Sequence, residues 1–445
     1  KAQLAADVVR LLWHIEGMCA GRWRLQVGAT WVLLAGFATA CTERESKGDP
    51  AKATSPQPSH VSQPAPEAKP TGVAASERRA AASAAEPTTP APAPEVVLPD
   101  GWVLDDLADV APAGPATATA RGVVMVTRDN AAHFARYTPR PRGASAGETQ
   151  VTPLELGAAQ LVALRRGPAV LGGFAYWIDG KRLLRRPYAK PGELETLAED
   201  ARHSTRVAAP REQRKGEPAL VAYVAGGPKD DSLLKAHLWV EGSGVVDVSD
   251  EAASANSVAI TRSSTGLVVL SLEARTGMTP IHARSVSFEN DRPKLGQDLV
   301  VWVGGPVDPL TEIVGASGPH QRLGFVATNR TATEFGLATL NIGDKPRMGA
   351  AVRWEDYPNG LDPAPVATTD ACRRGVVIFA RPSSPVPHAL QELRLGFISA
   401  GSVGESFVLA RSRGFANVSI AGSAHGALVA YTADRRTWAR ALRCK

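Results

Sequence analysis

The feature that most constrains the fold is a motif that recurs about every 50 residues from residue 116 onward. In six copies a valine followed by a small residue leads, 8 to 11 residues later, to the start of a short apolar run, which a glycine opens in most of them. The pairs are Val162-Ala163, Val207-Ala208, Val258-Ala259, Val314-Gly315, Val366-Ala367 and Val418-Ser419, and a seventh copy at Gly122 follows Ala116–Ala120 instead. Such a period indicates repeated units that bury their apolar faces against their neighbours.

Each copy predicts a set of short β-strands. The apolar runs contain mostly four to six residues between turn-forming residues, and none sustains the 3.6-residue period of a helix over 10 to 12 positions. Gly 41 and Pro 34 together make up about one residue in six, which also argues against a mostly helical chain. The small residue of each pair fits an innermost strand that approaches a common axis, and the glycine marks the turn into the second strand. The sequence therefore predicts an all-β domain.

One strand is displaced from its repeat. The seventh copy ends on its third strand at Cys444-Lys445, whereas a fourth strand follows each of the other six copies. The unassigned strand lies within residues 96–107, before the first copy. An N-terminal strand that completes the last unit closes a ring and protects its edges. We therefore expect a seven-bladed β-propeller of four-stranded blades over residues 96–445. Six or eight blades remain open because the second and third copies are irregular, and two β-sandwiches are the other alternative.

The beginning of the chain has the pattern of an export signal. Residues 25–38 form a run of 14 weakly polar to apolar residues after Arg22 and Arg24, which is too short to cross a bilayer. Ala38-Thr39-Ala40 directly precedes Cys41. This arrangement resembles the lipobox of bacterial lipoproteins, although Ala38 stands where the motif prefers leucine. The resemblance implies cleavage before Cys41, diacylation of its thiol, and an outer- or inner-membrane anchor that faces the periplasm or the cell surface. Ordinary cleavage nearby would instead release a soluble periplasmic protein.

The segments that surround this signal differ in composition. Met18 is a natural start for it, so residues 18–40 are predicted to be the signal peptide and residues 1–17 an upstream segment without a role. Residues 41–95 contain ten prolines among Ala, Ser, Thr, Glu and Lys, with almost no large apolar side chains. Such a segment cannot bury enough surface to offset its ordering entropy. We expect a disordered tether that spans on the order of 45 Å and holds the folded domain away from a membrane.

The predicted ring also predicts a binding face. In a propeller, the turns between second and third strands and the loops between blades emerge on one face, and here nearly all carry charged side chains. The candidate ligand-binding residues are Arg128, Asp129, Asp179, Lys181, Asp230, Asp231, Arg275, Arg330, Asp356, Arg381, Asp434 and Arg435. Turns are also polar simply because they are solvated. The favoured hypothesis is a noncatalytic binding or scaffold module for a polar ligand or an envelope protein.

Catalytic and cofactor signals are sparse. Gly143–Gly147 matches G-x-S-x-G but lacks the preceding strand and following helix of a nucleophile elbow, so we expect a loop. The nine histidines form no HExxH motif, and His133, His237 and His282, which fall in or beside third strands, are expected at the surface. No metal or cofactor site is predicted. Residues 432–438 resemble one degraded Asp-box of the sialidase-like propellers. This single resemblance keeps an envelope glycan hydrolase or lyase as the alternative function, which requires two carboxylates about 5 to 9.5 Å apart.

Charge and cysteines bound the remaining properties. The net charge of +6 comes from 50 basic and 44 acidic residues without a long basic run, so nucleic acid is not an expected partner. The propeller is expected to be a monomer. An oxidising compartment would invite a disulfide between Cys372 and Cys444. The expected positions, however, lie two strand spacings of roughly 4.8 Å apart, so the bond requires a local shift. Pairing of these two cysteines stays open from sequence.

Overall fold

A computed structural model provides the structure of the protein. It describes residues 98–99, 101–156, 167–199, 201, 207–226, 234–249, 254–263, 266–274, 279–290, 292–304, 312–315, 322–329, 332–341, 347–354, 366–384, 390–399 and 402–445. All of them belong to the compact unit formed by residues 84–445. The predicted upstream segment 1–17, signal 18–40 and tether 41–95 lie outside the described residues, as does the Val162-Ala163 pair.

The described residues form only β-strands, turns and irregular segments, with no helix that could cross a membrane. Their strands make seven antiparallel sheets, numbered 1 to 7 in the chain order of their innermost strands. Sheets 1 to 3 contain β3 (Ala116–Thr119), β4 (Gly122–Val126), β5 (Ala132–Arg136); β6 (Ala169–Leu171), β7 (Phe174–Asp179), β8 (Arg182–Pro187), β9 (Glu195–Ala198); and β10 (Val207–Ala208), β11 (Leu220–Gly226), β12 (Leu234–Val240), β13 (Gly244–Asp247). The all-β prediction is confirmed for this part of the chain.

The remaining sheets follow the same order. Sheets 4 and 5 contain β14 (Ser254–Ser263), β15 (Gly266–Ala274), β16 (Thr279–Glu289), β17 (Arg292–Leu295), β18 (Leu299–Gly304); and β19 (Glu312–Gly315), β20 (Arg322–Asn329), β21 (Ala332–Asn341), β22 (Arg347–Trp354). Sheets 6 and 7 contain β23 (Val366–Ala371), β24 (Arg374–Pro382), β25 (Gln391–Ser399), β26 (Ser402–Ser412); and β27 (Phe415–Ser423), β28 (Gly426–Ala433), β29 (Arg436–Cys444), β1 (Trp102–Leu104), β2 (Ala108–Pro112). Four of the seven sheets have four strands each.

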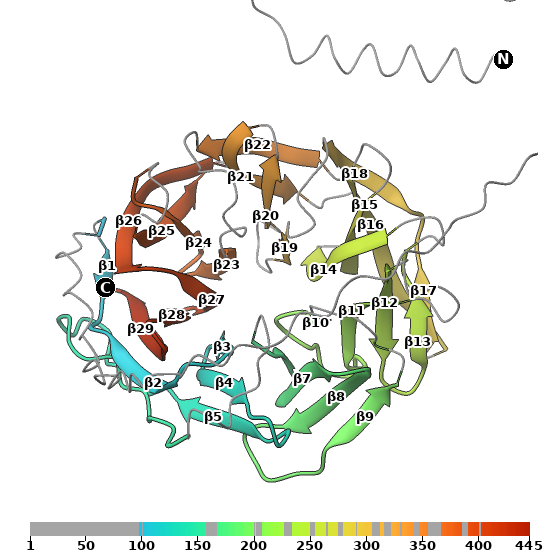
Figure 1. The fold of residues 1–445 in the computed structure, drawn as a ribbon, viewed down its shortest axis with the longest axis horizontal. Helices are drawn as coiled ribbons and strands as arrows, with labels where there is room; N and C mark the ends of the chain where they lie inside the picture. Colours follow the sequence, from blue (N-terminus) through green and yellow to red (C-terminus); the bar gives the residue numbers. More distant parts are fainter. Residues whose placement is uncertain are drawn as a thin grey trace, which may run out of the picture. The chain divides into compact units, whose positions relative to one another are not determined.

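The sheets of this unit follow one another around a common centre, with the first strand of each sheet innermost (Figure 1). Each sheet contacts the next one along the chain, for example β3 with β6, β11 with β14, and β23 with β27. The innermost strand of sheet 7, β27, also contacts β3 of sheet 1. This radial order of antiparallel sheets is the arrangement of a β-propeller.

The repeat motif occupies the positions that this packing requires. The valine pairs lie in the innermost strands β10, β14, β19, β23 and β27. Gly122 and Gly426 open the second strands of their sheets at φ angles of +157° and +150°. A Cβ atom at Gly122 would collide with the Ala135 carbonyl, and one at Gly426 with the Leu442 carbonyl. Glycine is therefore needed at both positions for the backbone angle and for the close approach of the third strand.

The hydrophobic core is a series of layers between neighbouring sheets. Val418, Ile420 and Val429 of sheet 7 pack with Val376 and Ile378 of sheet 6. Similar clusters join sheet 3 to sheet 4, sheet 7 to sheet 1, sheet 2 to sheet 3, and sheet 1 to sheet 2. Sheets 1, 2, 3 and 7 have such clusters on both faces. A second strand between two covered faces is rich in apolar residues, as in β28, where every residue is buried.

Two sheets differ from the predicted four-strand pattern. In sheet 1 the fourth strand expected after the third one is reduced to one bridge between Tyr137 and Val151. Pro153 has no N–H to donate, and Leu154 N donates to the Val110 carbonyl of β2 instead, at 2.7 Å. In sheet 4 the outer edge is divided, because β17 pairs with the end of β16 and β18 with its beginning. The repeat predicts one fourth strand in each copy, whereas two short strands share this edge.

The outer edge of sheet 7 is formed by β1 and β2. β1 lies within the range 96–107 predicted for the closing strand, whereas β2 follows that range. Trp102 of β1 pairs with Cys444, and β2 continues the edge by pairing with the first half of β29. Asp105 connects the two strands, and its carboxylate accepts hydrogen bonds from Arg443 at 2.7 and 2.8 Å. Both side chains are buried, with 0% and 5% of their surface exposed. The edge is therefore joined by an ion pair as well as by backbone hydrogen bonds.

Residues 143–147 are a loop, as expected for this G-x-S-x-G sequence. The guanidinium of Arg443 donates to the carbonyl oxygens of Ala144 and Ser145 at 3.2 and 3.0 Å. Backbone carbonyls, not the serine hydroxyl, thus make these contacts. The loop satisfies the buried arginine together with Asp105.

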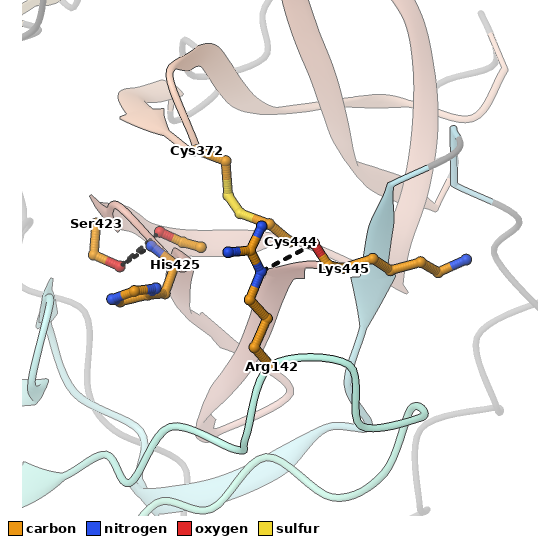
Figure 2. Close-up of a disulfide and its surroundings, with 7 residues drawn as sticks. Arg142, Cys372, Ser423, His425, Cys444 and Lys445 are labelled. Carbon is orange, nitrogen blue, oxygen red and sulfur yellow. Dashed lines mark hydrogen bonds between the residues drawn. A yellow bond between two sulfur atoms is a disulfide. The ribbon is translucent and has the colours of Figure 1, made fainter.

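Cys372 and Cys444 are joined by a disulfide with their Cα atoms 6.4 Å apart (Figure 2). Cys372 lies in the turn between β23 and β24, beyond the end of the strand where the sequence placed it. Its N–H donates to the Ser423 carbonyl at 3.1 Å, and that of Cys444 to the His425 carbonyl at 3.2 Å. Both cysteines therefore meet at the β27–β28 turn. The expected separation by two strand spacings does not apply, because that argument considered strand order and not the reach of the turns.

Candidate functional site

The propeller unit has two different ends around its centre. Turns between first and second strands lie at what we call the cavity end, and they include Ala120-Arg121, Gly172-Gly173, Cys372-Arg373 and Ala424-His425. Turns between second and third strands lie at what we call the loop end, and they include Arg128–Ala131, Gly180-Lys181 and Asp434-Arg435. In an antiparallel sheet these two kinds of turn lie at opposite ends of the second strand.

A cavity of about 1390 Å³ lies among the innermost strands and extends to the turns of the cavity end. Much of its wall is formed by β3, β6, β10, β23 and β27, with Phe134 and Tyr188 as the aromatic residues among its described lining. The two rings contact each other, with their centroids 5.2 Å apart. The charged residues of the described wall are Arg121, Arg136, Arg211, Glu212, Arg214, Arg262, Asp370 and Arg373.

Arg211 connects elements on different sides of the cavity. It follows β10 in sheet 3, and its guanidinium donates to Thr369 Oγ1 and to the Thr368 carbonyl in β23 of sheet 6. It also donates to the Ile420 carbonyl in β27 of sheet 7 at 3.3 Å. Burial lowers the pKa of Arg211 to about 10, while the nearby carboxylates of Asp370 and Glu212 act in the opposite direction. The guanidinium is therefore still protonated at neutral pH.

Polar side chains on the innermost strands fasten neighbouring sheets to one another. The Asn417 amide donates to the Ala116 carbonyl at 2.5 Å and accepts from the Gly167 N–H at 3.3 Å. Ser419 Oγ accepts from the Ala118 N–H at 3.0 Å. These contacts satisfy backbone groups on the inward edges of first strands, which pair with only one neighbouring strand. The residues thus hold the wall of the cavity.

The arginines of the wall differ in how far their charge is compensated. Arg262 forms an ion pair with Glu217, with Nη1 and Oε1 2.8 Å apart, and this contact lowers the pKa of the Glu217 carboxyl. Arg121, Arg136 and Arg373 are exposed and form no ion pair with a described residue. We call the part of the cavity where Arg121, Arg136 and Arg373 lie its mouth. The mouth thus carries positive charge that no ion pair within the described part of the chain compensates.

The predicted binding face falls at the loop end. Asp230, Asp231, Arg275, Arg330 and Asp356 lie outside the described residues. None of the other seven, which are Arg128, Asp129, Asp179, Lys181, Arg381, Asp434 and Arg435, is among the described residues that line the cavity. Ligand binding by the loop end therefore stays a prediction.

Several of these loop-end residues are engaged in contacts within the protein. Thr127 Oγ1 donates to Asp129 at 2.5 Å, and this hydrogen bond lowers the pKa of the Asp129 carboxyl. Asn130, which the sequence did not single out, donates to Asp179 at 3.1 Å and accepts from the Trp177 indole at 3.1 Å. Sheets 1 and 2 are joined by these contacts.

The loop end of sheets 6 and 7 is also occupied by internal contacts. Glu392 is buried and forms ion pairs with Arg394 at 2.6 Å and Arg411 at 3.0 Å. Arg381, one of the predicted residues, lies opposite Glu392 in the strand register, and burial lowers the pKa of its guanidinium. Asp434 accepts from Ser412 at 3.0 Å. These groups connect strands and sheets.

Two histidines differ from the surface positions expected for them. His237 is buried, and its Nδ1 lies 2.8 Å from Asp247. His282 is buried between Glu273, at 3.5 Å, and Asp298, at 2.8 Å. The third strands that carry them are covered on both faces, which a polar letter in the sequence does not reveal. Within the described residues, no group of three or more His, Cys, Asp or Glu side chains could hold a metal ion.

The arginines of the cavity end were not among the residues predicted from the sequence. A signal for them exists, because Arg121 directly precedes the repeated Gly122, and Arg373-Arg374 precedes the equivalent Gly375. Cationic residues before the glycine of two different copies are placed at the same end of the unit by the repeat itself.

No protein-family model and no curated protein matches the sequence. Similar solved structures include the N-terminal domain of Nup159, with 10% identity over 77% of this chain and 95% of that chain and a TM-score of 0.40. The Cps50 (Swd1) beta-propeller domain of Myceliophteria thermophila has 9% identity over 75% of this chain and 98% of that chain, with a TM-score of 0.42. A puromycin hydrolase has 15% identity over 72% of this chain and 50% of that chain, also with a TM-score of 0.42. Matches at these identities and TM-scores carry no information on ligand or activity.

Proposed function

We propose that the chain is a lipid-anchored protein of the bacterial cell envelope whose propeller unit binds a polar ligand in its central cavity without transforming it. The observation that carries the binding function is the cavity of about 1390 Å³ with its charged wall. A large concave site with converging polar groups is the default position of a ligand site in a folded domain.

The proposed propeller is a closed ring of seven blades. Its support is the count of seven sheets, the contact of β27 with β3, and the pairing of β1 and β2 with β29. A ring of this kind leaves the innermost strands facing a central space, which is where the cavity lies.

Anchoring rests on the resemblance of the sequence before Cys41 to a lipobox. Replacement of Cys41 by Ala should abolish acyl labelling and move the protein from the membrane fraction to the soluble fraction. A Thr42→Ala variant, which leaves the cysteine in place, serves as the matched control. Unchanged fractionation and labelling of the Cys41→Ala protein would remove the anchor from the proposal.

Binding in the cavity can be tested with a variant that obstructs its mouth. Ala120 is exposed in the β3–β4 turn and lines the cavity, whereas Ala146 is exposed in the outer loop and does not. We expect Ala120→Trp to lose capture of envelope components from an extract and Ala146→Trp to retain it, with thermal unfolding as a check that both fold. Equal capture by the two variants would place binding elsewhere.

A glycan hydrolase or lyase is the second candidate, for which the described cavity lining offers one pair of carboxylic acids. Glu212 and Asp370 are the acidic residues among the described cavity lining, and both act on Arg211. Two carboxylates near one bond are the requirement of glycoside hydrolysis. Release of reducing sugars from envelope glycan that disappears in Glu212→Gln and in Asp370→Asn would favour this candidate over noncatalytic binding.

A further inference from the structure

The wall of the cavity has a pronounced excess of positive charge. Its described charged residues comprise six arginines and two carboxylic acids, a difference of four positive charges over the same set of residues. For the whole sequence, 50 basic residues stand against 44 acidic ones. The excess of four positive charges in the described wall compares with a net charge of +6 for the whole sequence.

The excess is concentrated at the mouth and is contributed by different sheets. Arg121 lies in the β3–β4 turn and Arg136 at the end of β5, both in sheet 1, whereas Arg373 lies in the β23–β24 turn of sheet 6. All three are exposed and lack an ion pair with any residue that the structure describes. Their guanidinium groups can therefore approach one ligand from more than one side.

Deeper in the cavity, Arg211 presents a cation whose hydrogen-bond acceptors are neutral. Its guanidinium donates to a hydroxyl group and to two backbone carbonyls, from Thr369, Thr368 and Ile420. The desolvation cost of this charge is only partly offset by the carboxylates of Asp370 and Glu212. An anion that enters the cavity would improve the electrostatic environment of Arg211 as well as that of the arginines at the mouth.

We propose that the cavity binds a multivalent oxyanion, a ligand with at least two carboxylate or phosphate groups that Arg121, Arg136 and Arg373 hold at the mouth while Arg211 attracts it from within. This inference rests on the proposed binding function and specifies its ligand class. Guanidinium groups suit both oxyanions because their planar N–H groups form two parallel hydrogen bonds to either. The cavity exceeds the roughly 300–1,000 Å³ of common small-molecule pockets, so a ligand with several charged groups has room to enter.

The test measures binding of tripolyphosphate and of citrate to the full chain by calorimetry at 0.15 M salt, which distinguishes phosphate from carboxylate ligands. Maltotriose and inorganic phosphate are included as neutral and single-group probes. The decisive variant is Arg121→Gln with Arg373→Gln, which keeps the length and polarity of both side chains. Its matched control is Arg374→Gln, the exposed neighbour of Arg373 that does not line the cavity.

We expect at least one of the two multivalent probes to bind more tightly than inorganic phosphate, and the double variant to weaken that binding by about tenfold or more, because two charge-assisted contacts are lost. Arg374→Gln should change the affinity by less than about twofold, and thermal unfolding should confirm that every variant folds. Because exposed charges are screened by salt, binding should weaken further as the ionic strength is raised.

Two results would overturn the oxyanion proposal. One is the absence of binding by both multivalent probes, and the other is an equal loss of binding in Arg374→Gln or in Arg435→Gln at the loop end. If Ala120→Trp still loses capture of envelope components and Ala146→Trp retains it, the binding function stands and its ligand is neutral. If the two variants capture envelope components equally, both proposals are rejected.

Discussion

The two ends of the propeller unit use polar residues in different ways. At the loop end, Asn130 contacts Asp179 and Trp177, and Ser412 contacts Asp434, so polar side chains join neighbouring sheets. At the mouth of the cavity end, Arg121 and Arg373 project from the turns without an ion pair to a described residue. The contrast teaches that polar turns should be sorted by whether their groups are satisfied within the protein.

At the outer edge of sheet 7 the more strongly engaged charges lie toward the cavity end instead of the loop end. The largest effect of a substitution on stability is expected there. Arg443 and Asp105 form a buried ion pair toward the cavity end, whereas Arg436 and Asp109 form an exposed one toward the loop end. Asp105→Ala should destabilise the fold by about 3–5 kcal/mol, since Arg443 keeps an uncompensated buried charge. Asp109→Ala should cost less than about 1 kcal/mol. Equilibrium denaturation of both variants measures the difference, and similar costs would contradict it.

The disulfide provides the next largest test of how the cavity end is held. Cys372→Ala removes a link across 72 residues of sequence, and we expect a loss of about 2–4 kcal/mol. Cys372 has a φ of +52°, which alanine and cysteine tolerate about equally, so the backbone contributes little to the change. Thermal unfolding with and without a reductant measures it. A reductant should destabilise the wild-type protein and leave the variant unchanged. A wild-type protein that the reductant does not destabilise would show that the bond does not form.

The hydrogen bonds of Asn130 at the loop end should contribute less to stability than the Asp105–Arg443 ion pair or the disulfide. They should contribute more than the arginines of the mouth. Asn130→Ala removes two side-chain hydrogen bonds at a φ of +59° and should cost about 2 kcal/mol. Asn130→Gly relieves the backbone strain and should cost about 1 kcal/mol. The Arg121→Gln and Arg373→Gln changes should stay within about 0.5 kcal/mol. Chemical denaturation tests this ranking, and a larger cost at the mouth would reverse the comparison.

The smallest expected effect is the pH response of the loop end. Burial lowers the pKa of His133, whose ring lies 3.1 Å from Thr127, although Asp129 acts in the opposite direction. The unfolded chain therefore takes up this proton at a higher pH than the folded protein. The contribution of neutral His133 to the free energy of unfolding is therefore complete above a pH of about 6.5 and is lost as the pH falls. His133→Gln should reduce the fall in Tm between pH 8 and pH 5.5 by about 1–2 °C. An unchanged pH profile would exclude His133 from this response.

Much of the architecture could be predicted from sequence because the repeated residues occupy positions where packing restricts the size of the side chain. A valine followed by a small residue is placed next to the axis in every copy where β10, β14, β19, β23 or β27 contains it, and Gly122 and Gly426 occupy positions where a Cβ atom does not fit. These constraints are local and recur in each unit. The split edge of sheet 4 and the reduced edge of sheet 1 could not be predicted, because outer strands have no such constraint.

The site was less predictable for a different physical reason. The charge of a residue is visible in sequence, but whether that charge is compensated depends on partners from other sheets. Glu217 pairs with Arg262, 45 residues away, and Asp105 pairs with Arg443, 338 residues away. The sequence predicted polar turns at the loop end and did not distinguish them from the arginines at Arg121 and Arg373. Cys372 and Cys444 similarly depend on where two turns meet.

The pairing of β1 and β2 with β29 also sets the timing of folding. Asp105 is synthesised 338 residues before Arg443, which at about 5–20 residues per second is an interval of tens of seconds. During that time β1 and β2 lack the strand with which they pair, and apolar side chains such as Trp102 and Leu104 need protection from association with other chains. Synthesis of β29 is thus the step that allows β1 and β2 to become part of sheet 7.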